Sequence, residues 1–214
     1  MKILHVGNMA NLAYSNTKLL RENNIESELL MEKNPKKGSD PIRFDPALNE
    51  KYPDWIHFFD KSNPNWKFEI IKFMRSSEYD LIHAYVEMPM FAYFSRKKFV
   101  AQTQGSDFRE LAVSSTTRGF LLRRAYKKAK AILFFQPDHL PIFSKLHLKN
   151  GLFLPPPWDS SFFSPGISDN KDRPLTIFHP ANLEWRLKGN NKLLKGFSKF
   201  VKTHPNSLLV IVDR

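Results

Sequence analysis

The sequence contains no cysteine among its 214 residues, and this absence removes several classes of protein at once. Without cysteine there are no disulfide bonds, no thiolate zinc ligands and no cysteine nucleophile, so a secreted scaffold held together by disulfides is excluded. The redox compartment stays undetermined. With 42% hydrophobic residues, including 19 phenylalanines, and 25% charged residues, the composition is that of a folded globular protein.

Long apolar runs are missing too. The opening segment MKILHVGNMANLAYSN has one lysine and a short apolar run interrupted by His5 and Asn8, which is typical of neither a signal peptide nor a membrane span. No later stretch reaches 18 apolar residues. We therefore expect a cytoplasmic protein, with any membrane contact peripheral and on the inner membrane face.

Short motifs that identify common enzyme classes are also absent. The sequence has no G-x-x-x-x-G-K-[ST], G-x-G-x-x-G, H-E-x-x-H or G-x-S-x-G pattern and no Asp-x-Asp pair. This argues against P-loop NTPases, common NAD-binding domains, zinc metalloproteases, α/β-hydrolases and transferases that hold a divalent metal on two aspartates. The seven histidines are scattered singly, so we predict no metal site and no cofactor.

Positive charge is abundant and unevenly placed. The chain has 33 Lys and Arg against 21 Asp and Glu, and residues 96–149 carry twelve of the basic and three of the acidic residues, +9 of the net +12. Such a concentration attracts phosphate-bearing partners or anionic lipid headgroups, although a solvated basic face explains it equally well. No nucleic-acid-binding motif accompanies the charge, so nucleic acid is not expected as a partner.

Short apolar segments alternate with segments of helical spacing over the first 150 residues, which predicts a Rossmann-like parallel sheet with helices on both faces. The expected strands are residues 2–6, 27–31, 55–59, 80–85, 99–103 and 131–135. The expected helices are residues 11–22, 66–76, 90–95, 116–129 and 138–146, and residues 33–53 read as a long irregular connection.

A proline-rich stretch marks a boundary. Five prolines lie between Leu154 and Pro174, a density that neither a helix nor a central strand tolerates. We place an N-terminal domain at residues 1–165 and the beginning of a second Rossmann-like domain at residues 166–214, where one strand, one helix and one strand follow each other. Because a lone unit of this kind cannot bury both faces of a parallel sheet, we expect this second domain to be incomplete.

Three loops follow predicted strands, where sheets of this class bind ligands. Gly7 and Asn8 open the first, whose backbone N–H groups and following helix form a candidate anion site. Gln104-Gly105-Ser106-Asp107 forms the second, in which Asp107 accepts from a hydroxyl, orients the loop or caps a helix. In the third, Arg186 and Lys188 form a pair of cations suited to a diphosphate.

The ordered series of segments ILHVGN, YDLIHAY, QGSD, RRAYKKAKAILFFQPD, LFLPPPWDSSFFSP and IFHPANLEWRLKGNNKLLKGF resembles the family 4 glycosyltransferases of GT-B architecture. The resemblance covers essentially the whole chain, and the proline-rich crossover and the Lys188-Gly189 helix start are its most specific parts. It implies two facing Rossmann-like domains and transfer of a sugar from a nucleotide sugar, with retention at the anomeric carbon and without a metal.

The resemblance also assigns residues. It implies that Gly7, Asn8, Asn182, Arg186 and Lys188 bind the donor, with Asn182 an alternative to Arg186 because Arg186 lies close to Lys188. It places the acceptor in the N-terminal domain, on a set made of Asn11, Tyr14, Gln104, Gly105, Ser106 and Asp107. Gln104 stands where family members often have histidine, and no glutamate motif of the second domain is present, so the catalytic residues stay unassigned.

The helix expected from residue 116 is amphipathic in an unusual way. Its apolar positions share one arc, and the opposite arc holds an apolar side chain framed by cations: Phe120, Arg123, Arg124, Lys127 and Lys128. A buried face with a solvated basic back accounts for most of this pattern. The position of Phe120 favours docking on an anionic membrane surface, as the family resemblance also implies.

Two functions from different classes follow. The first is a retaining glycosyltransferase that transfers a sugar from a nucleotide sugar to a glycan, a lipid-linked or another acceptor, in polysaccharide biosynthesis. The alternative is a non-catalytic fragment or split subunit that binds acceptor and anionic membrane and needs a partner for the missing half-domain. Under either function we expect the isolated chain to have little or no transferase activity.

Overall fold

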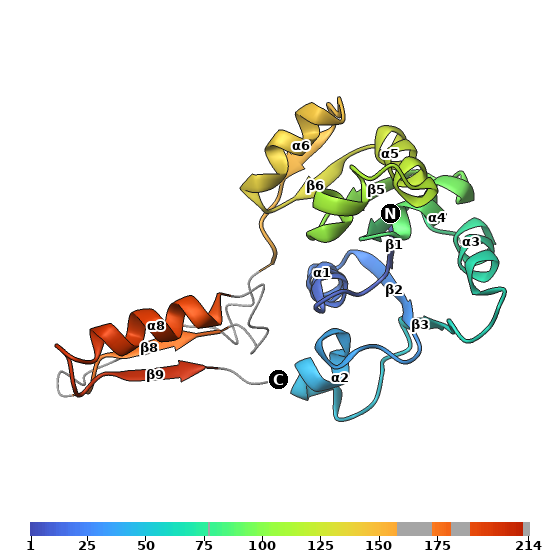
Figure 1. Ribbon diagram of the computed structural model, residues 1–214. Helices are drawn as coiled ribbons and strands as arrows, with labels where there is room; N and C mark the ends of the chain where they lie inside the picture. The colour runs from blue at the N-terminus through green and yellow to red at the C-terminus, as the bar shows by residue number, and fades with distance from the viewer. Residues whose placement is uncertain (77, 158–172, 181–188, 212–214) are drawn as a thin grey trace. The chain divides into compact units, whose positions relative to one another are not determined.

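The computed structural model describes residues 1–76, 78–157, 173–180 and 189–211 (Figure 1). The chain divides into two compact units, Met1–Asp159 and Ser160–Arg214.

The first unit is built on a seven-stranded, wholly parallel sheet. Its strands stand in the order β3-β2-β1-β4-β5-β6-β7. After β1 the chain first builds outward through β2 and β3, then returns to place β4 on the other side of β1. The strands are β1 (Lys2–Val6), β2 (Glu26–Glu32), β3 (Ile56–Phe59), β4 (Leu81–Tyr85), β5 (Phe99–Gln102), β6 (Ile132–Phe134) and β7 (Gly151–Phe153).

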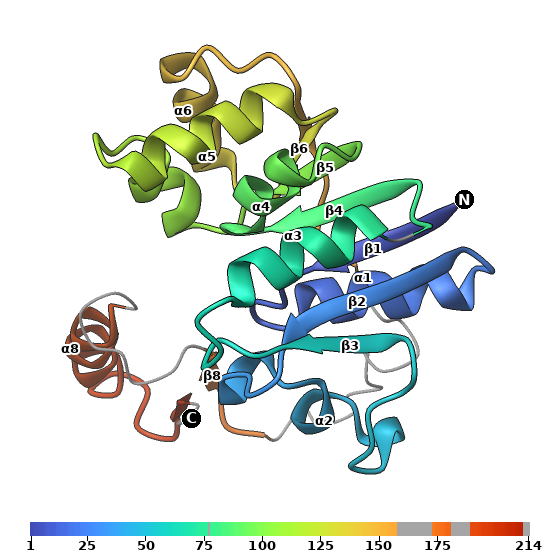
Figure 2. The ribbon, with the colours of Figure 1, turned by 90° about the vertical axis from the view of Figure 1, so that its right-hand side faces the viewer.

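Helices cover both faces of this sheet, which confirms the expected Rossmann-like architecture. α1 (Leu12–Glu22) lies on one face, and α3 (Trp66–Ser76) lies on the other (Figure 2). α4 (Met88–Ser95), α5 (Thr117–Lys128) and α6 (Leu140–Lys145) pack on the same side as α3. The connection after β2 holds short helical turns, among them α2 (Pro41–Phe44), which Asp40 caps by accepting from Ile42 N at 3.1 Å.

The strand residues alternate between two hydrophobic cores, as the pleat requires. Leu4 and Val6 of β1 point to the larger core with Ile82 and Ala84 of β4. Leu29 of β2 points to the smaller core, which α1 closes with its own apolar residues. These side chains are almost wholly inaccessible, so the burial of the central strands supplies most of the hydrophobic stabilisation.

The second unit contains two parallel strands and one helix among its described residues. β8 (Thr176–His179) pairs with β9 (Leu208–Ile211), and α8 (Asn190–Phe200) connects them. The order of one strand, one helix and one strand expected in the second domain is therefore found among the described residues. On one side of the pair Phe178, Leu208 and Val210 are exposed, so this face of the two-stranded sheet is apolar and accessible in the described part of the unit.

Candidate functional site

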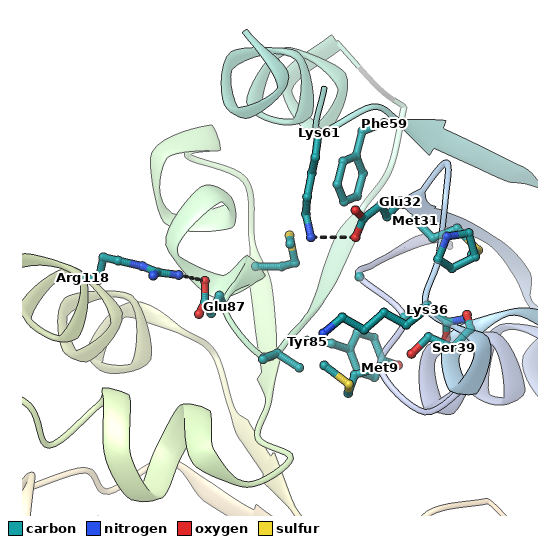
Figure 3. A pocket seen from close by; sticks show the side chains of 15 residues that line it. Met9, Met31, Glu32, Lys36, Ser39, Phe59, Lys61, Tyr85, Glu87 and Arg118 are labelled. Carbon is teal, nitrogen blue, oxygen red and sulfur yellow. Dashed lines mark hydrogen bonds and ion pairs between the residues drawn. The ribbon is translucent and has the colours of Figure 1, made fainter. Parts of the chain in front are cut away.

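A pocket of about 350 Å³ opens where the parallel strands of the first unit end (Figure 3). It is lined by the loops that follow β1, β2, β3 and β4, and by the start of α5. The lining residues are Gly7, Asn8, Met9, Met31, Glu32, Pro35, Lys36, Ser39, Phe59, Lys61, Tyr85, Val86, Glu87, Met88 and Arg118. We call it the switch pocket.

The position of the switch pocket follows from the order of the strands. β1 and β4 are neighbours in the sheet, and the strand order reverses between them: the chain continues from β1 to β2 on one side and from β4 to β5 on the other. It therefore leaves their carboxyl ends in opposite directions. Open α/β sheets bind their ligands in the crevice that this divergence creates. The loops at Gly7 and at Val86 form the two sides of that crevice.

Ion pairs stand on two walls of the switch pocket. Lys61 Nζ lies 2.6 Å from Glu32 Oε2, and Arg118 pairs with Glu87 on the opposite wall (Figure 3). Each carboxylate keeps further lone pairs that can accept from a hydroxyl group of a ligand. Among the described residues no carboxylate lies within ion-pair distance of Lys36, which is exposed.

The backbone at the switch pocket adopts conformations that are rare elsewhere. Val86 has φ of 58°, which is a true outlier for a β-branched residue, and its N–H donates to Gln102 O at 3.1 Å. Gly7 has φ of 88°, and its N–H donates to Leu30 O at 2.9 Å. Val86 is therefore strained, whereas glycine adopts positive φ without a steric penalty, and positive φ also occurs away from the pocket, for example at Asn49 and Arg96.

The expected anion site at the first loop is largely occupied by the chain itself. Asn8 Oδ1 accepts from Tyr14 N at 3.0 Å in the first turn of α1, and Asn8 Nδ2 donates to Asn11 Oδ1 at 2.9 Å. Asn11 is buried, and its amide also donates to Asp40 O at 3.4 Å. The sequence suggested that N–H groups at the start of α1 bind an anion. The N–H of Tyr14 is one of these groups, and it already donates to Asn8 Oδ1, so Asn8 satisfies part of the helix start in place of a ligand.

Tyr14 belongs to the core rather than to a binding surface. Its side chain is 1% exposed, stacks on Trp55 with ring centroids 5.7 Å apart, and donates to Asp45 Oδ2 at 2.7 Å. Burial and the bond to Asp45 raise the pKa of the Tyr14 hydroxyl. The structure therefore gives Tyr14 a packing role, and its expected contact with an acceptor stays a prediction.

A buried polar cluster lies in the sheet behind the switch pocket, and the sequence did not reveal it. The hydroxyl of Tyr85 lies 2.8 Å from His5 Nδ1 and 3.1 Å from His83 Nδ1, and it accepts from Asn16 Nδ2 at 2.9 Å. Because this hydroxyl has one proton to give, at most one of the two imidazoles accepts from it. The register of β1 and β4, which sets His5 opposite His83, creates the cluster.

Burial controls the ionisation of this cluster. Burial and the neighbouring His83 lower the pKa of His5 well below its usual range, and burial lowers the pKa of His83 to about 3. Burial likewise raises the pKa of Tyr85. All three side chains are therefore neutral at physiological pH, and they hold the end of β4 where it enters the strained turn at Val86.

Asp107 orients the second loop. Its carboxylate accepts from Gly105 N at 2.7 Å, from Gln104 N at 3.1 Å and from Tyr126 Oη at 3.2 Å. Burial raises the pKa of Asp107, although these donors oppose the shift. At 4% exposure Asp107 lies beneath the loop, so of its expected roles the structure supports loop orientation. Ser106 is exposed at the surface of the same loop.

Gln104 connects this loop to the switch pocket. Its Nε2 donates to Met9 O at 3.4 Å, and its carbonyl oxygen accepts from Gln136 Nε2 at 3.1 Å. The side-chain Oε1 is buried and has no hydrogen-bond partner among the described residues. Gln104 itself does not line the switch pocket, so its contact with the pocket runs through Met9.

The basic side of α5 is only partly free. Phe120 is 49% exposed, and the Arg124 guanidinium lies 5.4 Å from the centre of its ring. Lys127 and Lys128 are exposed as well. Arg123 differs from them, because it donates to Ala112 O at 2.7 Å and to Ser114 O at 2.6 Å and so fastens the helix to the preceding turn.

Three expected donor residues, Asn182, Arg186 and Lys188, lie outside the described residues. Within the part of the chain that the structure describes, no cluster of His, Asp and Glu could hold a metal ion. None of the helices described here is long and apolar enough to cross a membrane.

Known structures share the fold of this chain and resemble it only distantly in sequence. The N-terminal domain of trehalose-6-phosphate phosphatase from Candida albicans matches with a TM-score of 0.63 and 15% identity over 99% of this chain and 64% of that one. Sucrose-phosphate synthase from Thermosynechococcus elongatus matches with a TM-score of 0.58 and 8% identity, over 100% of this chain and 71% of that one. UDP-N-acetylglucosamine 2-epimerase from Rickettsia bellii matches with a TM-score of 0.54 and 8% identity, over 99% of this chain and 62% of that one.

These likenesses give the fold: the chain has a Rossmann-like first unit of the GT-B type, followed by a second unit that begins in the same way. The chain spans about two thirds of the length of these structures. No protein-family model and no curated protein sequence matches the chain.

Proposed function

We propose that the protein is a retaining glycosyltransferase related to family 4, which transfers a sugar from a nucleotide sugar to an acceptor bound in the switch pocket. The observation that carries this proposal is the position of the pocket at the strand ends flanking the reversal of strand order, in the first Rossmann-like unit of a GT-B-type fold. A sugar offers several hydroxyl groups, and the pocket walls offer the carboxylates of Glu32 and Glu87 to accept from them.

The donor side of the proposal depends on the sequence resemblance. Asn182, Arg186 and Lys188 are the residues proposed to hold the donor diphosphate, by charge-assisted hydrogen bonds and without a metal ion. Gly7 and Asn8, which the resemblance also gives to the donor, line the switch pocket and are assigned to the acceptor in this proposal. The name of one structural neighbour, UDP-N-acetylglucosamine 2-epimerase, indicates that a related fold accommodates a nucleotide sugar.

The test is a transfer assay on the full chain with UDP-, GDP- and ADP-sugars and a panel of sugar and glycolipid acceptors, which detects released nucleoside diphosphate. The Glu87→Gln variant keeps the shape of the side chain and removes its charge, so we expect kcat/KM for the acceptor to fall by about tenfold or more. Glu110→Gln is the matched control, because Glu110 is exposed and does not line the pocket. Equal activity of the two variants contradicts the proposal; where turnover of the isolated chain is too slow to follow, equal affinity of the two variants for the acceptor contradicts it.

The exposed apolar face of the second unit favours a second candidate function, that of a binding subunit. Phe178, Leu208 and Val210 present this face, and parallel sheets are covered on both sides in stable folds. In this alternative a partner completes the second unit and supplies catalysis. Acceptor binding without turnover by the isolated chain, with turnover restored by a partner and lost again in Phe178→Ser, would favour it over the first.

We also propose that α5 docks on anionic membranes, through Phe120 together with Arg124, Lys127 and Lys128. Each engaged cation contributes about 1 kcal/mol near an anionic surface, and salt weakens the attraction. Sedimentation with anionic and neutral liposomes should show binding to the anionic ones alone, reduced when these three cations become serine. Changing Lys192, Lys195 and Lys199 of α8 to serine removes the same charge and should leave binding unchanged.

A further inference from the structure

The charges around the switch pocket do not cancel. Its lining contains three cations and two carboxylates, and the carboxylates of Glu32 and Glu87 are each paired with a cation of the same wall. Lys36 is the remaining cation, and no carboxylate pairs with it among the described residues. The described lining therefore carries one uncompensated positive charge.

The geometry directs this charge into the pocket. Lys36 precedes the turn Lys37–Ser39 in an extended conformation, with φ of −61° and ψ of 149°. Its side chain runs across the pocket, with the ammonium end directed toward Tyr85 (Figure 3). An ammonium group on a flexible stem binds oxyanions as a point charge with three donors, so it suits a phosphoryl or carboxyl group.

The remaining lining suits the body of a small sugar. The paired carboxylates of Glu32 and Glu87 accept from hydroxyl groups, and Met9, Phe59 and Met88 offer apolar surface to a ring. A volume of about 350 Å³ is near the lower end of the range for small-molecule sites, which favours a ligand of one or two sugar rings.

We infer that the switch pocket binds a sugar carrying a phosphoryl or carboxyl group, and that the Lys36 ammonium holds this acidic group. That this sugar is the acceptor of glycosyl transfer rests on the function proposed above. The acidic group then fixes the orientation of the sugar, and the paired carboxylates select among its hydroxyl groups.

The experiment measures binding to the full chain, without donor, by titration calorimetry. The probes are glucose 6-phosphate, glucuronate and uncharged glucose. We expect the two acidic sugars to bind more tightly than glucose, and Lys36→Gln to weaken the acidic sugars by about tenfold while leaving glucose unchanged. Lys37→Gln, which removes the same charge one residue further along and outside the pocket lining, should change no affinity by more than about twofold.

The source of the acidic group is decided by a further arm. Phosphatidylcholine vesicles with and without phosphatidate report whether a lipid-borne phosphoryl group engages Lys36, whereas the soluble sugars report a free one. Tighter binding of the acidic sugars that depends on Lys36 and not on Lys37 supports the inference, whereas Lys36-dependent binding of phosphatidate vesicles alone overturns the sugar in favour of a lipid headgroup. Equal responses of the two variants in both arms, or acidic sugars that bind no better than glucose while vesicle binding ignores Lys36, overturn it.

This outcome is separable from that of the transfer assay. Binding is measured without donor, so Lys36-dependent binding can be present when no transfer occurs. Conversely, transfer to an uncharged acceptor would support the proposed glycosyltransferase activity and contradict the inference that the acceptor is an acidic sugar.

Discussion

Polar groups at the two ends of the seven-stranded sheet differ in how far they are hydrogen-bonded or ion-paired. At the amino end, Glu28 accepts from three side chains: Lys2 at 2.8 Å, His57 at 2.7 Å and Tyr79. Asp80 accepts from the backbone N–H of Lys2 at 2.8 Å. The polar groups named here all bond to one another, and this end closes on itself.

At the carboxyl end, polar groups are left for something else to satisfy. Lys36 has no ion-pair partner and Gln104 Oε1 has no hydrogen-bond partner among the described residues, and Val86 is held at positive φ. The same sheet therefore has a hydrogen-bonded amino end, and a carboxyl end with a strained turn and the pocket proposed as a binding site. The contrast is one of degree, because Ser27 Oγ at the amino end is also buried without a hydrogen-bond partner among the described residues, and it supports the site proposed at the switch pocket.

The largest effect expected from this comparison is at the amino end. Burial alone would raise the pKa of Glu28, but bonds from Lys2, Tyr79 and His57 outweigh it and lower the pKa to about 2. Glu28→Ala removes the common acceptor and strands the hydroxyl of Tyr79, so the free energy of unfolding should fall by about 3 kcal/mol. Urea unfolding measures the loss, and glucose 6-phosphate affinity should not change in the folded variant.

Glu26→Ala is the matched control for this prediction. Glu26 also pairs with Lys2, at 3.4 Å, but its side chain is 61% exposed, so its loss should cost less than about 0.5 kcal/mol. Equal losses in the two variants would show that charge, and not the closed network around Glu28, stabilises the amino end.

A second prediction concerns the histidines between the two ends. When the pKa of a histidine is lower in the folded state than in the unfolded state, the unfolded chain binds the proton more readily. The free energy of unfolding is therefore highest above pH 6.5 and falls as the pH is lowered toward the folded pKa. For His83, whose pKa falls from 6.5 to about 3, the loss between pH 8 and pH 5 is about 2 kcal/mol, and His5 adds to it in the same direction.

Urea unfolding of the chain at pH 8 and at pH 5 measures this dependence. His83→Gln, which can still bond to Tyr85, should flatten it, whereas His147→Asn at an exposed position should not. A wild-type stability that does not change over this range would contradict the neutral, buried state of the histidine pair.

The sequence predicted the elements of the fold well where burial was strong. β1, β4 and β5 are short apolar runs whose alternate residues enter the larger core, so their pattern identified them. β7 was missed, because it has three residues, lies at the edge of the sheet and leaves Leu152 and Phe153 exposed. A strand with little burial has no hydrophobic pattern for a sequence to display.

The switch pocket could not be predicted as a whole from the sequence. Its loops were expected at Gly7 and Asn8, but Glu32, Lys36, Lys61, Glu87 and Arg118 come from separate segments that only the strand order brings together. The pairing of His5 with His83 likewise depends on the register of strands far apart in the chain. Residues that read as isolated charges or scattered histidines acquired their roles from topology.

The smallest expected effect separates backbone geometry from charge at the carboxyl end. Gly7→Ala places a side chain at φ of 88° and brings a Cβ to 2.9 Å from Met88 Cγ, which can move. The cost is therefore mainly conformational, about 1 kcal/mol in the free energy of unfolding. Gly38→Ala is the control, because nothing lies within 4 Å of its Cβ and its φ is ordinary, so alanine should leave stability unchanged or raise it slightly.

The Gly7 substitution also tests the switch pocket, because a displaced Met88 would narrow it. Gly7→Ala should therefore weaken the binding of glucose and of glucose 6-phosphate equally, whereas Lys36→Gln should weaken only the binding of glucose 6-phosphate. A Gly7→Ala effect confined to glucose 6-phosphate would instead make the Gly7 loop part of the anion site.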